Sequence, residues 1–366
     1  KRRRTRIKNR WGYLKYFRIF PPMKICLITN YTREYINDLQ IFHKLLETLE
    51  LSSKDVFNIS SLNSVYNIND NYTHSLVLLD FKSTNISLHK QFLSEVNIPR
   101  IFIVDTIPKI QKDLDITFNK ELRNSNISHL TSLPFSSQLF LYEQYADGLV
   151  FYSSIDQTYF RDTYPIKNSI PSCIIPPSLG NKEDIQIDFS YFSPNNNIGF
   201  NGSPSFSNGI YHLFDALFPS SNYNVNIFGS HGRNELSNEI LVNHITKTSS
   251  YIKFKGRLKD PTFFFKENHI YHNISIYDSF NYFTFTSLLN GMVPILSYST
   301  STAEYFPSYP FTSDIDSNSI NNTLEKILST PTKELKDILL TTVLSLKHLN
   351  NKDLKKEYFN FLNSIA

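Results

Sequence analysis

The sequence predicts an α/β protein with two Rossmann-like domains that face each other across a cleft and end in C-terminal helices. Short apolar runs rich in β-branched residues alternate along the chain with segments of helical periodicity. No Asn-Gly or Asp-Gly pair joins two neighbouring strand segments as a tight hairpin, which favours parallel strands linked by helices. The 366 residues also exceed the usual size of one domain, and a hydrophobic content of 40% allows two packed cores.

The N-terminal domain is predicted to span residues 23–192 and to begin with the apolar run that follows Met23. A helix is expected at residues 35–51, where apolar side chains recur every three or four positions. The predicted strands are residues 24–29, 75–80, 101–105, 148–152 and 172–175. Because helices separate these strands, we expect a parallel sheet that is covered on both faces.

A C-terminal domain is predicted over residues 198–366, after a linker at Ser193-Pro-Asn-Asn-Asn. Its predicted strands are residues 198–201, 224–228, 252–255, 274–276 and 293–297. A helix is expected at residues 209–217, and amphipathic helices at 319–328, 331–349 and 352–365 close the chain. Two such domains leave one obvious place for chemistry, the crevice between them at the C-terminal ends of the strands.

Residues 1–22 form a basic N-terminal extension. They contain nine Lys or Arg and no acidic residue, so the formal charge of +4 for the whole chain leaves −5 for the remainder. Interleaved aromatic residues such as Trp11 and Tyr13 would suit contact with nucleic acid or an anionic membrane surface. The alternative is a solvated upstream segment, because the rest of the chain has no matching surplus of basic residues.

Several function classes lose support from what the sequence lacks. The two cysteines, Cys26 and Cys173, cannot form a disulfide framework, and no Cys/His spacing fits zinc. The chain contains no G-x-G-x-x-G, P-loop, G-x-S-x-G or H-E-x-x-H motif. No apolar run approaches the ~18 residues that a transmembrane helix needs, so we expect a soluble, cytoplasmic protein.

Four turns of the second domain each leave a strand where an anion would dock. They are residues 201–209, 228–233, 255–258 and 277–294. Gly202 and Gly209 permit close approach of the backbone, and the helix start after Gly209 presents amides to a phosphate.

The order of these motifs resembles the GT-B glycosyltransferases, specifically the large retaining glycosyltransferase group 1 (family 4-like) that includes sucrose and glycogen synthases. Residues 146–153 followed by 174–180 are similar to the end of that family's first domain. Residues 202–209 occupy the place of its Gly-Arg…Lys-Gly turn. Residues 278–294 occupy the place of its Glu-x7-Glu helix and Gly-x-Pro strand, and Glu304 falls close to the acid that often follows.

The resemblance implies a nucleotide-sugar donor held by the second domain, with no cofactor and no obligatory metal. Its implied donor-binding residues are Gly202, Ser203, Asn208, Gly209, Arg233, Arg257, Lys259, Asn281, Tyr282, Phe283, Thr284 and Thr286. Ser203 and Asn208 stand where the family has Arg and Lys, and Thr286 replaces the second Glu, which grips the donor ribose. The pyrophosphate would then depend on amides near 281–284 and on Arg233, Arg257 or Lys259.

Asp105 and Asp278 are the expected catalytic residues. Asp105 ends a predicted strand, and the resemblance implies the role of Asp278, which stands in the place of the first Glu of the Glu-x7-Glu motif. Asn30, Thr32 and Arg33 follow the first strand, where the acceptor is expected to bind. The structural alternatives are a helix cap for either aspartate, a hydrogen bond to its own helix for Thr286, and a surface charge for Arg257. The Asp-x-Asp pairs Asp113/Asp115 and Asp314/Asp316 lie in polar stretches, and no metal site is predicted there.

The predicted function is transfer of a sugar from a nucleotide-sugar to an unknown acceptor, with retention and without metal. One alternative is a phage-type DNA base glucosyltransferase, because residues 202–215 resemble a helix entry in a phage DNA α-glucosyltransferase. The second alternative is a catalytically inactive GT-B scaffold that only binds a glycan or partner. The departures at Asn208 and Thr286 favour that alternative.

Overall fold

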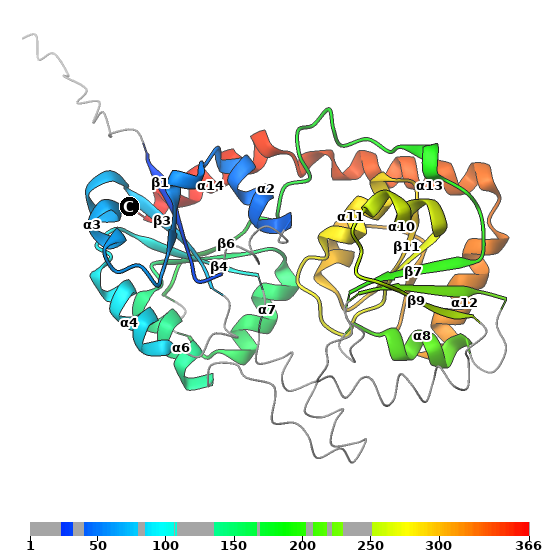
Figure 1. Ribbon diagram of the computed structural model, residues 1–366, viewed down its shortest axis with the longest axis horizontal. Coiled ribbons are helices and arrows are strands. Elements are labelled where there is room, and N and C mark those ends of the chain that lie inside the picture. The colour runs from blue at the N-terminus through cyan, green and yellow to red at the C-terminus, as the bar shows by residue number, and fades with distance from the viewer. Residues whose placement is uncertain are drawn as a thin grey trace, which may run out of the picture.

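The protein folds into two lobes, each built on one parallel sheet (Figure 1). The computed structural model describes residues 23–31, 40–79, 85–105, 107, 135–166, 169–202, 208–217, 222–229 and 251–365. We call the part that carries strands β1–β6 the first lobe and the part that carries β7–β12 the second lobe. The predicted α/β class with two Rossmann-like units is confirmed.

The first sheet has the strand order β2-β1-β3-β4-β5-β6, and every pair is parallel. Its strands are β1 (Ile25–Thr29), β2 (Val56–Asn58), β3 (His74–Leu78), β4 (Arg100–Val104), β5 (Gly148–Phe151) and β6 (Ser172–Ile174). Alternate residues of the central strand β3 enter different apolar clusters, Leu76 and Leu78 one and Val77 the other. The sheet is therefore covered on both faces, as the sequence predicts.

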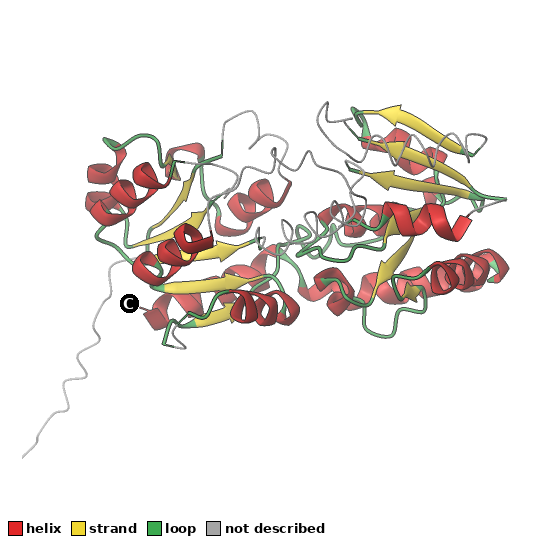
Figure 2. Ribbon diagram, turned by 90° about the horizontal axis from the view of Figure 1, so that it is seen from below, coloured by secondary structure: helices red, strands yellow, loops and turns green. Residues whose placement is uncertain are grey.

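Helices flank this sheet on both sides (Figure 2). They are α2 (Gln40–Leu49), α3 (Ser64–Asn71), α4 (Ile86–Glu95), α6 (Phe135–Tyr145) and α7 (Ser154–Thr163), with a short 3₁₀ turn η1 (Ser53–Asp55). A second 3₁₀ turn, η2 (Phe189–Tyr191), lies on the second lobe, where Tyr191 packs on Phe265. Helix α7 begins after Ser153, whose hydroxyl accepts the amide of Asp156 at 2.9 Å. A serine in this position satisfies one of the amides that the first turn leaves unpaired.

The second sheet has the order β12-β11-β10-β7-β8-β9, again with parallel pairs. Its strands are β7 (Asn197–Asn201), β8 (Asn224–Phe228), β9 (Ile252–Gly256), β10 (Ile270–Asn273), β11 (Val293–Ser297) and β12 (Thr312–Ser313). The helical elements are α8 (Ile210–Leu217), α10 (Pro261–Glu267), α11 (Tyr282–Leu289), α12 (Ser317–Ser329), α13 (Thr332–Ser345), α14 (Asn351–Ile365), η3 (Ser301–Tyr305) and η4 (Leu346–His348).

One predicted strand is misplaced. The prediction at residues 274–276 followed an Ile-Ser-Ile run, whereas β10 ends at Asn273. All four residues of β10 are buried between β7 and β11, including His272 and Asn273. Polar side chains in a central strand break the continuous apolar pattern by which buried parallel strands are recognised, and this explains the error.

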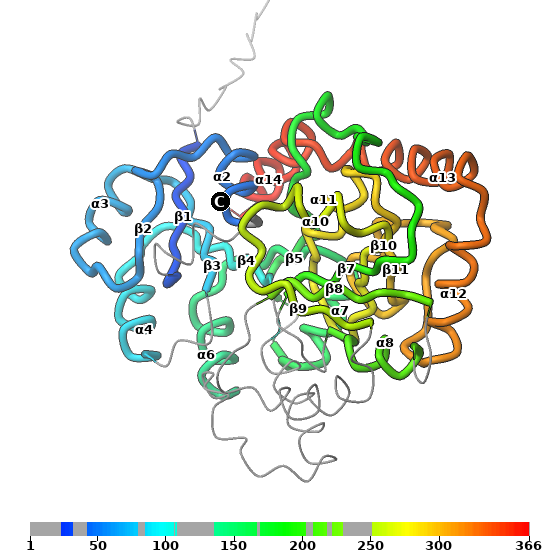
Figure 3. The backbone as a smooth tube through the Cα atoms, turned by 45° about the vertical axis from the view of Figure 1, so that its right-hand side comes forward, coloured from blue at the N-terminus to red at the C-terminus, as the bar shows by residue number. Residues whose placement is uncertain are grey.

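The last helix, α14, packs on the first lobe (Figure 3). It lies against α2, where Thr48 donates to the side chain of Asn351 at 3.1 Å and Lys355 pairs with Glu50 at 2.7 Å. A Cβ on Gly148 of β5 would lie 2.4 Å from the tip of the Ile365 side chain, so α14 approaches β5 closely here. The domain boundaries 23–192 and 198–366 stay a prediction. Helix α14, which belongs to the second of these ranges, covers part of the first sheet.

The chain passes between the lobes twice, and the two passages are hydrogen-bonded side by side. The amide of Leu179 donates to the carbonyl of Leu349 at 2.8 Å, and Asn351 donates to Gly180 at 2.8 Å. A single apolar cluster also contains buried residues of both lobes, Leu27 and Leu296 among them. Among the helices of the described residues, none is both long and apolar enough to span a membrane.

Candidate functional site

Each sheet has a topological switch point, the place where ligands bind in open α/β sheets. In the first sheet β1 and β3 are neighbours, and the chain leaves β1 toward β2 on one side and β3 toward β4 on the other. In the second sheet the neighbours β7 and β10 lead in the same way to β8 on one side and to β11 on the other. The segments that follow β1, β7 and β10 therefore mark the candidate site, and the predicted residues Asn30, Gly202 and Asp278 lie in or next to them.

The carboxyl ends of the two sheets meet directly. The hydroxyl of Ser279, in the segment after β10, donates to the main-chain carbonyl of Asp105, at the end of β4. The amide of Ile107 donates to the Tyr277 hydroxyl at 2.8 Å, and the ring of Tyr277 lies edge-on to Tyr159 of α7, 6.0 Å between centroids. The structure thus brings together the two segments that carry the predicted catalytic residues, Asp105 and Asp278.

The two aspartates differ in environment. The side chain of Asp105 accepts a hydrogen bond from the Tyr31 hydroxyl at 3.4 Å. Asp278 is half-buried, and desolvation raises the pKa of its carboxyl to about 6, with hydrogen bonding by Asn281 opposing the rise. A carboxyl with a pKa near 6 exchanges its proton close to neutral pH, which suits a group that takes part in acid–base chemistry.

The N-terminus of α11 rests on a buried polar network. Asn281 caps this helix, because its side-chain oxygen accepts the amide of Thr284 at 3.2 Å. Its side-chain amide donates to Asn273 at 3.1 Å, and Asn273 donates to the Thr284 hydroxyl at 2.8 Å. The Tyr271 hydroxyl donates to the Asn281 oxygen at 3.3 Å. These contacts fix the start of α11 relative to the end of β10.

The network already uses most of the amides that were predicted to hold the donor pyrophosphate. The amide of Asn281 donates to the Thr302 hydroxyl at 2.9 Å, and the amides of Tyr282 and Thr284 donate to main-chain carbonyls at 3.0 Å each. Within the described part of the chain, the amide of Phe283 is the one of the four that donates to no protein acceptor. Its ring stacks on Phe265 at 5.9 Å between centroids, away from the polar network.

Thr286 lies one turn into α11, and its hydroxyl donates to the carbonyl of Tyr282 at 3.2 Å. A hydrogen bond from Thr286 to its own helix is the structural alternative that was given for this residue above. The predicted contact of Thr286 with a donor ribose stays a prediction.

The turn before α8 has the close backbone approach that its glycines predict. Gly209 has φ +70°, and a Cβ there would lie 1.6 Å from the carbonyl oxygen of Ile274. Gly202 has φ +138°, and its amide donates to the Phe228 carbonyl at 2.8 Å. The turn carrying Asn208 and Gly209 therefore lies against the segment after β10, which joins two predicted donor-binding motifs at one switch point.

The remaining predicted residues are less central or lie outside the description. Arg257 and Lys259 are exposed after β9, an edge strand that β7 and β8 separate from β10. The side-chain amide of Asn30 lies 3.4 Å from Nε2 of His89. Thr32, Arg33, Ser203, Arg233, Asp113, Asp115 and the basic extension 1–22 lie outside the described residues. Asp316 caps α12, accepting the amides of Asn318 and Ser319 at 3.0 Å each.

Sequence reasoning missed a buried carboxyl at the contact between the lobes. Asp156 of α7 is 1% exposed and accepts hydrogen bonds from Ser301 of η3 at 2.7 Å and from Ser153 at 2.9 Å. Burial raises the pKa of Asp156 to about 7. The Ser-x-x-Asp spacing of residues 153–156 signals a helix start, but nothing local to it indicates a partner 145 residues away.

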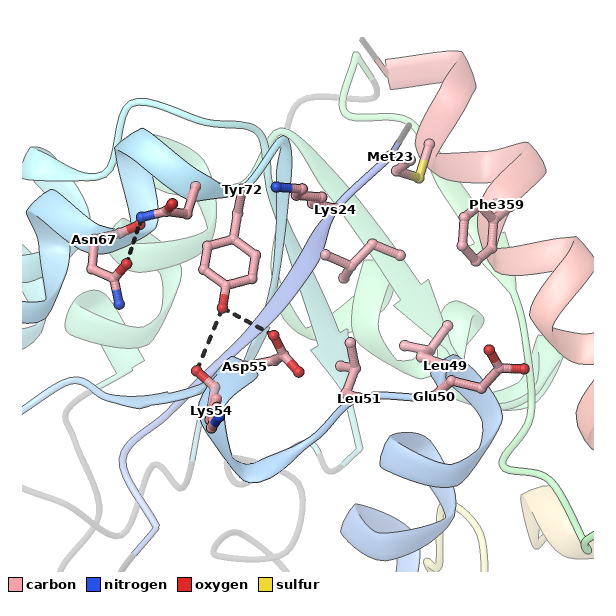
Figure 4. A pocket seen from close by; sticks show the side chains of 12 residues that line it. Met23, Lys24, Leu49, Glu50, Leu51, Lys54, Asp55, Asn67, Tyr72 and Phe359 are labelled. Carbon is pink, nitrogen blue, oxygen red and sulfur yellow. Dashed lines mark hydrogen bonds between the residues drawn. The ribbon is translucent and has the colours of Figure 1, made fainter. Parts of the chain in front are cut away.

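A separate pocket of about 500 Å³ lies at the other end of the first sheet, where strand β1 begins (Figure 4). Met23 and Lys24, just before β1, line it together with Phe359 of α14. Tyr72 crosses one wall, and its hydroxyl donates to Asp55 at 2.9 Å. Because this pocket faces the amino ends of the strands, it lacks the position that ligand sites of open α/β sheets occupy.

No family model and no curated protein matches this sequence. Solved structures match it over nearly its whole length. Anabaena HepE, solved in complex with UDP and glucose, is 12% identical with a TM-score of 0.68, over 93% of this chain and 100% of that chain. Sucrose-phosphate synthase from Thermosynechococcus elongatus is 12% identical with a TM-score of 0.64, over 93% and 98% of the two chains.

A third similar structure is a trehalose-6-phosphate synthase, from a study of glycosyl transfer with retention. It is 11% identical with a TM-score of 0.60, over 94% of this chain and 100% of that chain. At such identities the likeness concerns the fold. Two parallel six-stranded sheets whose carboxyl ends meet, matched to these structures across both lobes, give this chain the GT-B fold.

Proposed function

We propose that the protein is a glycosyltransferase that takes a sugar from a nucleotide-sugar donor. The observation that carries the proposal is the contact between the carboxyl ends of the two sheets, where Ser279 of the second lobe bonds to Asp105 of the first lobe, while Gly209 packs on Ile274 within the second lobe. In this arrangement a donor on the second lobe faces an acceptor on the first. The same fold in Anabaena HepE binds UDP-glucose, which supports a UDP-sugar as the donor.

We assign the leaving diphosphate to the second lobe. The turn of Asn208 and Gly209 at the start of α8, together with the Phe283 amide, would supply main-chain donors to the anion. Arg257 and Lys259 are exposed cations after β9 and would add charge as the nucleotide enters. This assignment needs no metal, because amides and cations neutralise the diphosphate as it departs.

We assign the acceptor to the first lobe, at the end of β1 and β4. Asn30 follows β1 beside His89, and Asp105 ends β4 next to the second lobe. Asp278, with its pKa near 6, is the carboxyl placed to exchange a proton with the reacting sugars. Retention is the proposed stereochemical outcome, by analogy with the trehalose-6-phosphate synthase of the same fold.

A thermal-shift panel of UDP-, GDP-, ADP-, CMP- and dTDP-sugars tests the proposal. A donor at 100 times its Kd adds about 2.7 kcal/mol of stability, which corresponds to a rise in Tm of roughly 3–4 °C for a chain of 366 residues. Asp278→Asn should reduce that rise, because it alters a carboxyl at the switch point. Asp337→Asn makes the same chemical change on the exposed surface of α13 and should leave the rise unchanged.

The outcomes separate the possibilities. If no sugar nucleotide in the panel stabilises the chain, the proposal is wrong. If a donor stabilises both variants equally, the fold binds nucleotide but Asp278 has no part in it. If a UDP-sugar stabilises the chain but no UDP is released from it, the inactive scaffold is favoured. The Thr286 hydroxyl supports that alternative, because it donates to the carbonyl of Tyr282 in its own helix.

A further inference from the structure

Helix α7 of the first lobe and η3 of the second lobe touch through a compact set of polar contacts. Ser301 and Glu304 belong to η3, and their partners are the first residues of α7. Tyr305 adds a hydrogen bond from its hydroxyl to the carbonyl of Tyr152, just after β5. We call this set the α7–η3 contact. It joins residues about 150 positions apart and contains no group that the proposed reaction uses.

Glu304 completes the N-terminus of α7 from the other lobe. Its carboxylate accepts the amide of Ser154 at 3.0 Å, the Ser154 hydroxyl at 2.8 Å and the amide of Ile155 at 3.4 Å. A carboxylate in this position also interacts favourably with the helix dipole. Since these amides belong to one lobe and the acceptor to the other, they lose their partner whenever the lobes separate.

Asp156 is buried at this contact, where both lobes reach it. Its oxygens accept from Ser153 of its own lobe and from Ser301 across the contact. Among the described residues, the charged groups that act on it are two carboxylates, Asp278 from the segment after β10 and Glu304 from η3. The phenols of Tyr152, Tyr277 and Tyr305 also face it.

This environment disfavours a negative charge on Asp156. Burial is the main reason that the pKa of this carboxyl rises to about 7, and the two neighbouring carboxylates add to it, while the serine hydroxyls oppose it. When η3 leaves α7, water reaches the carboxyl and Glu304 moves away. The pKa should then return toward its ordinary value near 3.8.

We propose that the α7–η3 contact is a proton-linked latch between the lobes, in which Asp156 takes up one proton as the lobes close and releases it as they open. The latch goes beyond the proposed reaction, since no substrate takes part in it. Protonated Asp156 can also donate a hydrogen bond, whereas the anion only accepts. Closure is therefore strongest at acidic pH.

The sign and size follow from the two protonation states. Between pH 6 and pH 8 the closed state loses the proton that the open state already lacks, so closure weakens as pH rises. For a closed-state pKa of about 7 and an open-state value near 3.8, the closing equilibrium falls about tenfold over this range. Asp278, with a pKa of about 6, contributes a further factor of about two in the same direction.

Native-state amide exchange of the full chain measures this equilibrium even when the open state is rare. The probes are the amides of Ser154 and Ile155, followed by mass spectrometry in a peptide that contains both. Their protection factors, corrected for intrinsic exchange, should fall about twentyfold from pH 6 to pH 8. In Asp156→Asn the fall should shrink to about twofold.

Two further variants keep the test decisive. Asp162→Asn changes an exposed carboxyl on the same helix and should reproduce the pH response of the parent chain. Ser301→Ala removes a donor that stabilises the Asp156 anion, so the midpoint of the response should move to higher pH, which tests the latch even if Asp156→Asn fails to fold. Protection that is constant from pH 6 to pH 8, or a full response in Asp156→Asn, would overturn the proposal.

Discussion

Helices α7 and α11 begin on opposite sides of the contact between the lobes, and their first amides are satisfied in different ways. Helix α11 takes its cap from Asn281 and its neighbours, all within the second lobe. Helix α7 takes part of its cap from Ser153 and the rest from Glu304 of the other lobe. One helix start is therefore fixed whether the lobes are open or closed, and the other is complete only when they are closed.

This difference indicates that the two helix starts have different roles. The start of α11 lies beside the switch point of the second sheet, where a donor needs a site that exists before binding. The start of α7 lies where the lobes touch, and its incomplete cap links the stability of the helix to closure. Four substitutions test the comparison, and they are taken from the largest expected effect to the smallest.

Asn281→Ala should destabilise the second lobe by about 2–3 kcal/mol. It removes the cap of α11, which is worth about 1 kcal/mol, and takes from the buried oxygen of Asn273 the closer of its two donors, which leaves Ser275 at 3.3 Å and adds a further loss of about 1–2 kcal/mol. Urea unfolding measures the loss. Asn363→Ala on the exposed face of α14 is the control and should change stability by less than about 0.5 kcal/mol. An equal loss in both variants would mean that the network does not hold α11.

The part of this arrangement that the sequence predicts is the part with local signals. Strand and helix alternation predicts both sheets, and Gly202 and Gly209 predict the tight turn before α8, because positive φ favours glycine. The contacts between Ser279 and Asp105 and between Ser301 and Asp156 join residues 174 and 145 positions apart. No periodicity or motif records such pairs, since they arise only when two separately folded sheets meet.

The acidic residues also show that the sequence does not reveal contacts between the lobes. Asp278 is predicted as a site residue because it stands in the place of the first Glu of the resembling motif, and the structure puts it at the contact with the first lobe. For Glu304 the sequence indicates only that it falls close to an acid that follows the Gly-x-Pro strand of the resembling family. Its contact with α7 depends on how the lobes pack. Burial, which sets the pKa of Asp156, is a property of the folded surroundings that composition does not reveal.

Asp156→Asn should remove a pH-dependent share of stability. The folded-state pKa of about 7 lies above the model-peptide value of 3.8, so this group stabilises the fold at low pH and loses that contribution as pH rises through 7. Between pH 6 and pH 8 the loss is about 1.4 kcal/mol. Burial lowers the pKa of His269 to about 4 and of His272 to about 3, so both act in the opposite direction as pH rises through 6.5.

The difference between the parent chain and Asp156→Asn isolates the aspartate, because both chains keep the two histidines. Free energies of unfolding from urea titrations at pH 6, 7 and 8 give the curve. We expect the parent chain to lose about 1.4 kcal/mol relative to the variant over this range. A difference that does not change with pH would mean that Asp156 titrates alike in the folded and unfolded chain.

Glu304→Ala should have a smaller effect, about 0.3–1 kcal/mol, because an exposed carboxylate at a helix N-terminus contributes that much. The loss should be confined to the start of α7, where the protection of the Ser154 and Ile155 amides should fall. The amide of Thr284, capped within its own lobe, should keep its protection. Glu325→Ala, in the middle of α12, is the matched control and should alter neither probe. Equal losses at α7 and α11 would contradict the comparison.

Thr286→Val should have the smallest effect of the four. The hydroxyl of Thr286 donates to the Tyr282 carbonyl of its own helix, and valine replaces it with little change in volume, so stability should change by less than about 0.5 kcal/mol. If α11 is fixed by its own side chains and its second turn makes no donor contact, affinity for a stabilising nucleotide-sugar should stay within twofold. Isothermal titration of the parent chain and the variant with that donor measures it. A tenfold loss of affinity would instead place Thr286 on the donor ribose, as the glycosyltransferase resemblance implies, and would mean that its hydroxyl leaves the helix to bind ligand.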